Sequence, residues 1–136
     1  MEIVLLLLAD YANVSRGGKL NVMGVFDHLH ASKFPTRHPQ MHLVLRLRAE
    51  LGEPSGPREL TIRVLNQDGR QIISLPPRKF RVPDSKEGRR SDMNFIIGLR
   101  DIVFPEAGSY EFMVEVDEEP QASIPLHVLP RSQRQS

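Results

Sequence analysis

The chain has 136 residues, no cysteine and a formal net charge of +1. This length predicts one domain, over residues 1–130 with a frayed tail at 131–136, that buries roughly two thirds of its unfolded surface. The composition excludes a disulfide framework, a thiolate metal site and a cysteine nucleophile, and the near-neutral charge gives no general attraction to nucleic acid or to a membrane.

The N-terminal segment is apolar from Ile3 to Ala9. The chain then becomes polar and reaches a turn at Arg16–Lys19. The apolar run is much shorter than the ~20 residues of a membrane-spanning helix. It also lacks the basic flank and the cleavage site of a secretory signal. We therefore expect a strand covered on both faces, no membrane contact and a cytoplasmic protein.

The segment from Lys19 to Ala31 is a predicted strand with apolar residues on both faces, and its Gly24 indicates a β-bulge. It holds more apolar surface than one core face requires. Such a surplus often marks an interface. The apolar residues on its second face are Met23, Val25 and Leu29. A loop over 34–39 is predicted next, because it contains two prolines.

The middle of the chain alternates apolar and polar residues with the two-residue period of a strand. Predicted strands lie at 41–48, 60–64, 72–75 and 93–99, with a short edge strand around Phe80 and Val82. The turn Asn66–Gly69 contains Asp-Gly, which indicates a hairpin. The charged loop Pro83–Ser91 offers no apolar anchor, so we expect it to be mobile and sensitive to proteases.

The clearest pattern lies between Asp101 and Val128 and predicts a closing hairpin. Alternate residues from Tyr110 to Val116 are apolar, whereas Glu111 and Glu115 fall on the other face. Gly108 stands two residues before Tyr110. This spacing indicates a corner in which the tyrosine hydroxyl bonds nearby backbone while the ring packs inside.

These elements predict an all-β fold. No window of eleven residues has the spacing of an amphipathic helix, and eleven prolines are scattered along the chain. About eight short strands separated by turns predict a two-sheet antiparallel β-sandwich, immunoglobulin-like and with Greek-key connections, and a closed barrel is the alternative. The predicted core consists of Leu43, Leu45, Ile62, Val64, Phe95, Ile97, Tyr110, Phe112, Val114 and Leu126.

Four stretches carry a resemblance to a known family. Ala-Asp-Tyr-Ala-Asn-Val at 9–14 is followed by Gly-Lys-Leu-Asn-Val-Met-Gly-Val-Phe-Asp at 18–27. Further along come Phe104-Pro105-x-x-Gly108-x-Tyr110-x-Phe112 and the ending Pro125-Leu126-x-Val128. The chain resembles a family of small uncharacterised bacterial β-sandwich proteins, a domain of unknown function. The resemblance covers most of the chain and implies no catalytic residue.

Four histidines, His28, His30, His38 and His42, lie close together in the sequence. The first two would share one face of a strand, and neutral imidazoles at that spacing can bind zinc or nickel with Asp27. The sequence identifies no third fixed ligand and no residue that would orient the rings. We therefore expect partly exposed histidines and no metal site, and the alternative remains open.

Other chemical patterns are incomplete. The acidic residues Asp84, Asp117, Glu118 and Glu119 lack the Asp-x-Asp spacing of a calcium site, so we expect solvated turns. Ser109 has no histidine near it in sequence and no Gly-x-Ser-x-Gly around it. The run Arg16–Lys19 is too short for a phosphate-binding loop.

The charged residues are also better explained as solvated or paired surface groups than as parts of a functional site. Glu111 and Glu115 are expected to be solvated or to pair across strands with Arg46 and Arg48, although paired carboxylates can hydrolyse glycosides. The basic stretch 78–90 contains a single aromatic residue, so a solvated loop is favoured over a nucleic-acid site.

The failure of each catalytic pattern leaves binding as the favoured function. We expect a non-enzymatic binding or assembly module that contacts a protein partner or another copy of itself, with no catalytic, cofactor-binding or metal-binding residue and no cofactor. A carbohydrate- or small-ligand-binding sandwich is the alternative, although the chain has no tryptophan and only two tyrosines to form a sugar platform. A hydrolase using the acidic strand face is a third hypothesis.

Overall fold

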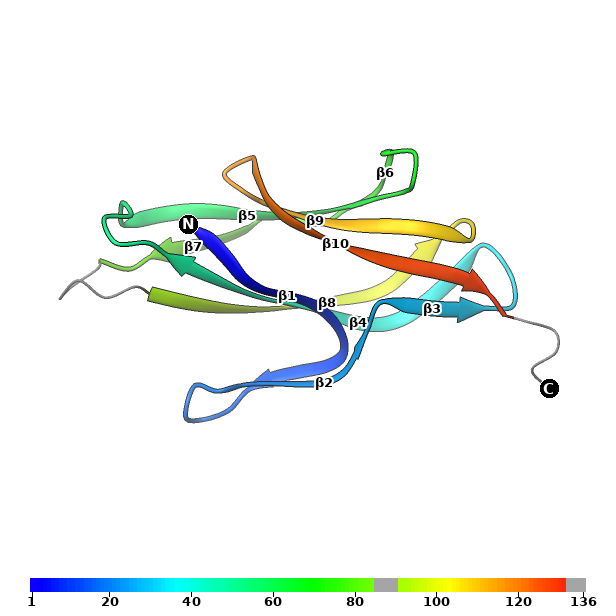
Figure 1. Cartoon of the computed structure of the whole chain (residues 1–136), viewed down its shortest axis with the longest axis horizontal. Coiled ribbons are helices and arrows are strands. Elements are labelled where there is room, and N and C mark those ends of the chain that lie inside the picture. Colours follow the sequence, from blue (N-terminus) through cyan, green and yellow to red (C-terminus); the bar gives the residue numbers. More distant parts are fainter. Residues whose placement is uncertain (85–90, 132–136) are drawn as a thin grey trace.

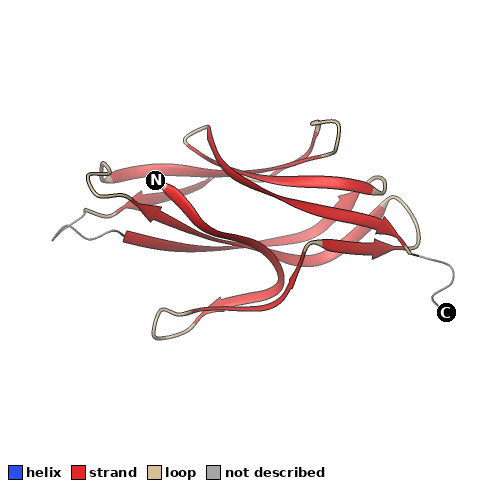
Figure 2. Cartoon of the chain, in the orientation of Figure 1, coloured by secondary structure: helices blue, strands red, loops and turns tan. Residues whose placement is uncertain are grey.

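The computed structural model describes residues 1–84 and 91–131. These residues form strands and turns and contain no helix (Figure 2), so none is available that could cross a membrane. The predicted mobile loop Pro83–Ser91 falls largely on 85–90, outside the described residues. The strands are β1 (Glu2–Val14), β2 (Leu20–Phe26), β3 (His28–Ala31), β4 (Thr36–Ala49), β5 (Gly56–Leu65), β6 (Gln71–Ser74), β7 (Arg78–Val82), β8 (Ser91–Phe104), β9 (Gly108–Val116) and β10 (Glu119–Pro130).

The strands form two sheets that pack face to face (Figure 1). Sheet A has the order β2-β1-β4-β8, and sheet B has the order β3-β10-β9-β5-β6, with β7 also paired to β5. The pairs are antiparallel, except that β3 runs parallel to β10. The predicted all-β sandwich is confirmed, with ten strands among the described residues instead of about eight.

The core lies between the sheets and consists of the inward-facing residues of alternating strands. Leu43 and Leu45 of β4 and Phe112 and Val114 of β9 are completely buried. Nine of the ten predicted core residues are buried. The exception is Phe95, which is partly exposed and whose ring centroid lies 5.2 Å from that of Phe80 on β7.

The predicted tyrosine corner is present at the start of β9. The Tyr110 hydroxyl donates to the Glu106 carbonyl oxygen at 2.6 Å and accepts from the Glu106 N–H at 3.3 Å. Burial raises the pKa of Tyr110, which favours the protonated, hydrogen-bond-donating phenol. The ring meets Phe104 edge-on, with centroids 4.9 Å apart, and thereby fixes the start of the central strand of sheet B.

The prediction of a loop over 34–39 is partly wrong. Strand β4 begins at Thr36 and pairs with the end of β8. Pro39 has no N–H to contribute, but the ladder passes from His38 to Gln40 without using it. Opposite this gap Asp101 has a left-handed conformation, with φ of 52°. The local irregularity therefore accommodates a proline inside a long strand.

The single strand predicted over 19–31 is two strands in different sheets. Phe26 at the end of β2 lies opposite Leu8 of β1, whereas His28 at the start of β3 lies opposite His127 of β10. The Asp27 carbonyl between them accepts the His127 N–H at 2.9 Å. The chain therefore crosses from sheet A to sheet B at Asp27.

Candidate functional site

The outer surface of sheet A carries a group of exposed apolar side chains on β1 and β2. Tyr11 lies opposite Met23, and Ala9 lies opposite Val25, so these residues share one face. Met23 is 66% exposed, Val25 61% and Tyr11 49%, while Ala9 between them is buried. We call Tyr11, Met23 and Val25 the β1–β2 face.

Polar groups border the β1–β2 face and hold it in place. The Asn21 side-chain amide donates to the side-chain Oδ1 of Asn13 at 2.9 Å. The His42 ring lies edge-on to Tyr11, with centroids 5.7 Å apart. Its Nδ1 is 3.1 Å from the Asp10 carbonyl oxygen. The exposed aromatic ring is thus supported by a neighbouring strand.

Gly24 allows β2 to lie against β1 behind this face. Its φ is +71°, and a Cβ at this position would lie 2.5 Å from the Asp10 Oδ2. Only glycine combines this backbone conformation with this contact at low cost. The β1–β2 register shows no shift here, so the predicted bulge at Gly24 is instead a left-handed residue in a continuous ladder.

An apolar pocket lies beside the β1–β2 face, where β2 leaves sheet A. It has a volume of about 340 Å³. Leu7 and Val25 belong to its wall, so the pocket continues the exposed apolar surface around the edge of the sandwich. Its full lining is Leu6, Leu7, Leu8, Val25, Phe26, Asp27, Ile124 and Pro125.

The other end of the outer face of sheet A is polar. Arg46 donates to the Asn94 side chain at 2.8 Å, and Arg48 binds the Asp92 carboxylate at 2.9 and 3.2 Å. The expected pairing of these arginines with Glu111 and Glu115 is therefore wrong, because the glutamates lie on sheet B. There Arg63 binds Glu115 at 3.0 Å, and the Ser123 hydroxyl donates to Glu111.

The structure separates the four histidines that lie close together in sequence. His28 and His30 are on β3 in sheet B, whereas His38 and His42 are on β4 in sheet A. His38 lies near Phe26, with ring centroids 6.1 Å apart. The hydrogen bond of Asp27 Oδ1 with His28 Nδ1, 2.7 Å long, lowers the pKa of Asp27.

Ser109 has a histidine partner that its sequence neighbourhood does not reveal. The register of β9 and β10 places His127 opposite Ser109, and the serine Oγ lies 2.9 Å from the histidine Nδ1. Beside them is a cleft of about 490 Å³ whose wall includes Gln67, Ser109 and Glu111. Among the described contacts no carboxylate bonds His127, so the pair lacks the third group of a catalytic triad.

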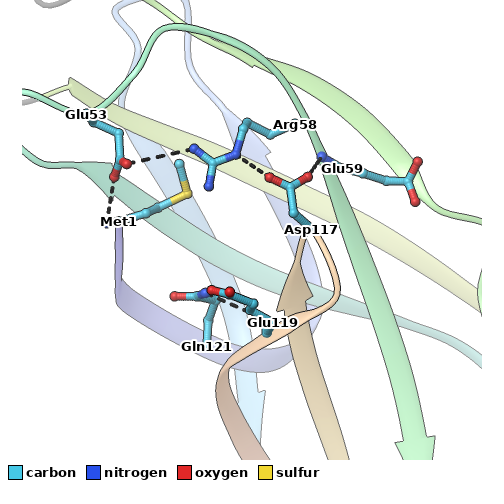
Figure 3. Close-up of polar contacts among 7 residues, drawn as sticks. All are labelled: Met1, Glu53, Arg58, Glu59, Asp117, Glu119 and Gln121. Carbon is cyan, nitrogen blue, oxygen red and sulfur yellow. Dashed lines mark hydrogen bonds and ion pairs between the residues drawn. The ribbon is translucent and has the colours of Figure 1, made fainter.

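The acidic turn after β9 is anchored by cationic groups (Figure 3). Asp117 accepts from the Arg58 guanidinium and from the Glu59 N–H, the latter at 3.0 Å. Glu53 lies 2.6 Å from the Met1 ammonium and 3.8 Å from Arg58. These hydrogen bonds lower the pKa values of both carboxyl groups. The carboxylates therefore form an ion-pair network at this end of the sandwich.

The chain belongs to a family of unknown function (DUF6941), whose family model matches residues 4–129. This confirms the resemblance to a domain-of-unknown-function family. No curated protein matches the sequence significantly.

Similar solved structures include a protein described as a beta-galactosidase from Bacteroides fragilis, with 13% identity and a TM-score of 0.43. Another is a beta-glucosidase from Listeria innocua, with 11% identity and a TM-score of 0.46. The matches cover 70% and 76% of this chain but only 16% and 14% of those chains. The protein thus spans about a seventh of the length of these neighbours, and such distant matches assign no activity to it.

Proposed function

We propose that the protein is a non-enzymatic association module that binds a protein partner through the β1–β2 face. The observation that carries this proposal is the exposure of Tyr11, Met23 and Val25 beside one another. Together they leave roughly 300 Å² open, which is the size of the largest, often functional, patch on a typical monomer. A partner that covers them gains the free energy of removing apolar surface from water.

The composition and rigidity of this surface support the same function. Tyrosine and methionine are enriched in protein interfaces, and polar groups commonly form the rim around an apolar centre. Here the rim includes the Asn13–Asn21 hydrogen bond and His42. Because β1 is paired with both β2 and β4, little backbone ordering is needed when a partner binds.

The pocket next to Val25 adds a feature that a partner can use. Its volume of about 340 Å³ is enough to take an apolar side chain, and it opens at the edge of the β1–β2 face. Binding residues commonly centre on an anchor that fills such a pocket. The partner we propose is therefore a protein surface with an apolar patch and a protruding apolar side chain.

The proposal also places this module in the cytoplasm of a bacterium.

A second candidate function is the binding of a small polar ligand. The cleft beside Ser109 has a volume of about 490 Å³, within the range of small-molecule sites. Gln67 and Glu111 offer hydrogen-bonding groups there, but Tyr110, the aromatic residue among the described lining residues, is buried and offers no open ring face to a sugar. This observation supports small-ligand binding less strongly than the β1–β2 face supports protein binding.

Site-specific photocrosslinking in cells that express the chain tests the proposed function. A photoreactive side chain replaces Met23 in one variant and Val103 in a matched control, since Val103 is 46% exposed on β8, away from this face. We expect position 23 to crosslink to one dominant protein, and mass spectrometry of the product tells a second copy from another chain. Adding Tyr11→Glu should abolish that product.

The outcome at the control position decides between a specific and an unspecific contact. Equal crosslinking at positions 23 and 103, or a product that survives Tyr11→Glu, would refute the β1–β2 face as a binding surface. The circular dichroism spectrum of each variant shows whether the fold is retained.

A further inference from the structure

Three histidines lie beside one another on the outer surface of sheet B, where β3 runs along β10. His28 and His30 are two residues apart on β3, and the parallel register places His127 directly opposite His28. Leu29 and Val128, which are also paired, face the core. Because successive side chains of a strand point to opposite faces, all three imidazoles lie on the outward face.

The spacing of the first two rings suits a shared metal ion. The ring centroids of His28 and His30 are 5.6 Å apart, and the ring planes are nearly perpendicular, at 89°. Two imidazoles on one tetrahedral zinc ion, with Zn–N distances of ~2.1 Å, have centroids roughly 5 Å apart. A small rotation of either ring is enough to close this difference.

Two of the three rings have a partner on Nδ1. The His28 Nδ1 lies 2.7 Å from the Asp27 Oδ1, and the His127 Nδ1 lies 2.9 Å from the Ser109 Oγ. When Nδ1 donates its proton to such an oxygen, Nε2 carries the lone pair that binds a metal. Metal-ligating histidines almost always have such a partner, which fixes the tautomer and the ring orientation.

We propose that His28, His30 and His127 bind a divalent transition metal ion through their Nε2 atoms. Asp27 and Ser109 would act as positioning residues for two of the rings. Three neutral imidazoles suit zinc, and a set of three protein ligands leaves a fourth tetrahedral position for water or another ligand. The three histidines lie outside the β1–β2 face, although Asp27 also lines the neighbouring pocket, and metal binding does not depend on the function proposed for that face.

Metal binding requires the exposed side chains to rotate with the Nδ1 contacts of His28 and His127 kept, and it requires no change of the backbone. In the conformation described, no three His, Cys, Asp or Glu side chains within residues 1–84 and 91–131 could hold a metal ion. The side chain of His28 is 56% exposed, and His30 is also exposed. Exposed side chains move between rotamers readily, while the paired strands already set the positions of all three Cα atoms.

A metal ion at this position would tie β3 to β10, beside which it lies in sheet B. Strand β3 has four residues and follows directly on the crossing of the chain at Asp27. An ion that binds the folded state and not the unfolded chain stabilises the fold by mass action. Occupancy of the site would therefore hold together the end of sheet B where the chain changes sheets.

Titration of the full chain, without a histidine tag, with Zn²⁺ and Co²⁺ tests the proposal. We expect one ion per chain, a visible Co²⁺ spectrum typical of tetrahedral coordination, and a higher melting temperature in Zn²⁺. His30→Ala and His127→Ala should weaken binding by more than ~100-fold, and Asp27→Asn by about 10- to 100-fold, the effect typical of an orienting partner. Affinity should fall on acidification, because imidazolium cannot bind a metal.

His38→Ala is the matched control, because His38 is a partly exposed histidine on β4 in sheet A. It should leave the affinity and the Co²⁺ spectrum unchanged. The proposal is overturned if the wild type fails to bind either ion at micromolar concentration. It is also overturned if His127→Ala binds as tightly as the wild type, which would indicate adventitious binding by neighbouring surface histidines. Circular dichroism without metal confirms that each variant folds.

Discussion

Replacement of Phe112 by alanine tests how the two sheets are held together. Phe112 is completely buried on the central strand β9, between Val64 of β5 and Ile124 of β10. Losing a fully buried phenylalanine side chain removes about 1.5–3 kcal/mol of transfer free energy. Because paired strands on both sides prevent collapse, a residual cavity of roughly 50–100 Å³ adds about 1–2.5 kcal/mol. We expect a total loss of about 3–5 kcal/mol.

Urea unfolding followed by circular dichroism measures this loss as a lower transition midpoint at an unchanged slope. Val103→Ala is the matched control, because Val103 is 46% exposed, and it should change stability by less than ~0.5 kcal/mol. A loss below ~1 kcal/mol for Phe112→Ala would mean that the inward face of β9 has been assigned incorrectly.

Two further changes test the tyrosine corner and the acidic turn. Tyr110→Phe removes the hydroxyl that bonds Glu106 and should cost about 1 kcal/mol in urea unfolding; an unchanged midpoint would contradict a stabilising corner. The pKa of Asp117 is lowered mainly by its hydrogen bond with Arg58, so its stabilisation should be complete above the unfolded value of about 3.9 and fade as the pH falls through the folded value. The stability advantage of the wild type over Asp117→Asn should therefore shrink below about pH 4, and a constant difference from pH 7 to pH 3 would refute this assignment.

Local patterns predicted much of the fold because side-chain direction in a strand is encoded residue by residue. The alternation around Tyr110 and Phe112 identified the buried face of β9 correctly. The spacing of Gly108 and Tyr110 indicated a corner whose hydrogen bonds are present. Such signals need only neighbouring residues, so they do not depend on which strands pair.

Pairing between distant strands could not be predicted in the same way. The alternation from Lys19 to Ala31 contains no signal that Asp27 divides it between two sheets. Ser109 has a histidine partner only because β9 and β10 pair in one particular register. Likewise His28 and His127 are far apart in sequence and meet through a parallel pair at the sheet edge. The candidate metal ligands were therefore only partly recognisable beforehand.

The β1–β2 face was anticipated more closely. The surplus apolar residues Met23 and Val25 are exposed as the sequence indicated, whereas Leu29, predicted on the same face, lies on β3 and packs against the core. The contribution of Tyr11 came from its position opposite Met23 on β1. The sequence alone does not mark Tyr11 as part of a binding face. The segment after Ala9 is polar, and a single tyrosine is common on protein surfaces.

Oxidative footprinting of Met23 tests the central claim most directly. The protein is exposed to a brief pulse of oxidant in expressing cells and, separately, after purification and dilution, and oxidation of Met23 is compared with that of Met113, which is partly exposed on sheet B. If the β1–β2 face binds a partner, Met23 should oxidise readily in the dilute purified protein and several-fold more slowly, relative to Met113, in the cell. Equal relative rates under the two conditions would show that the face is uncovered and would contradict the proposed function.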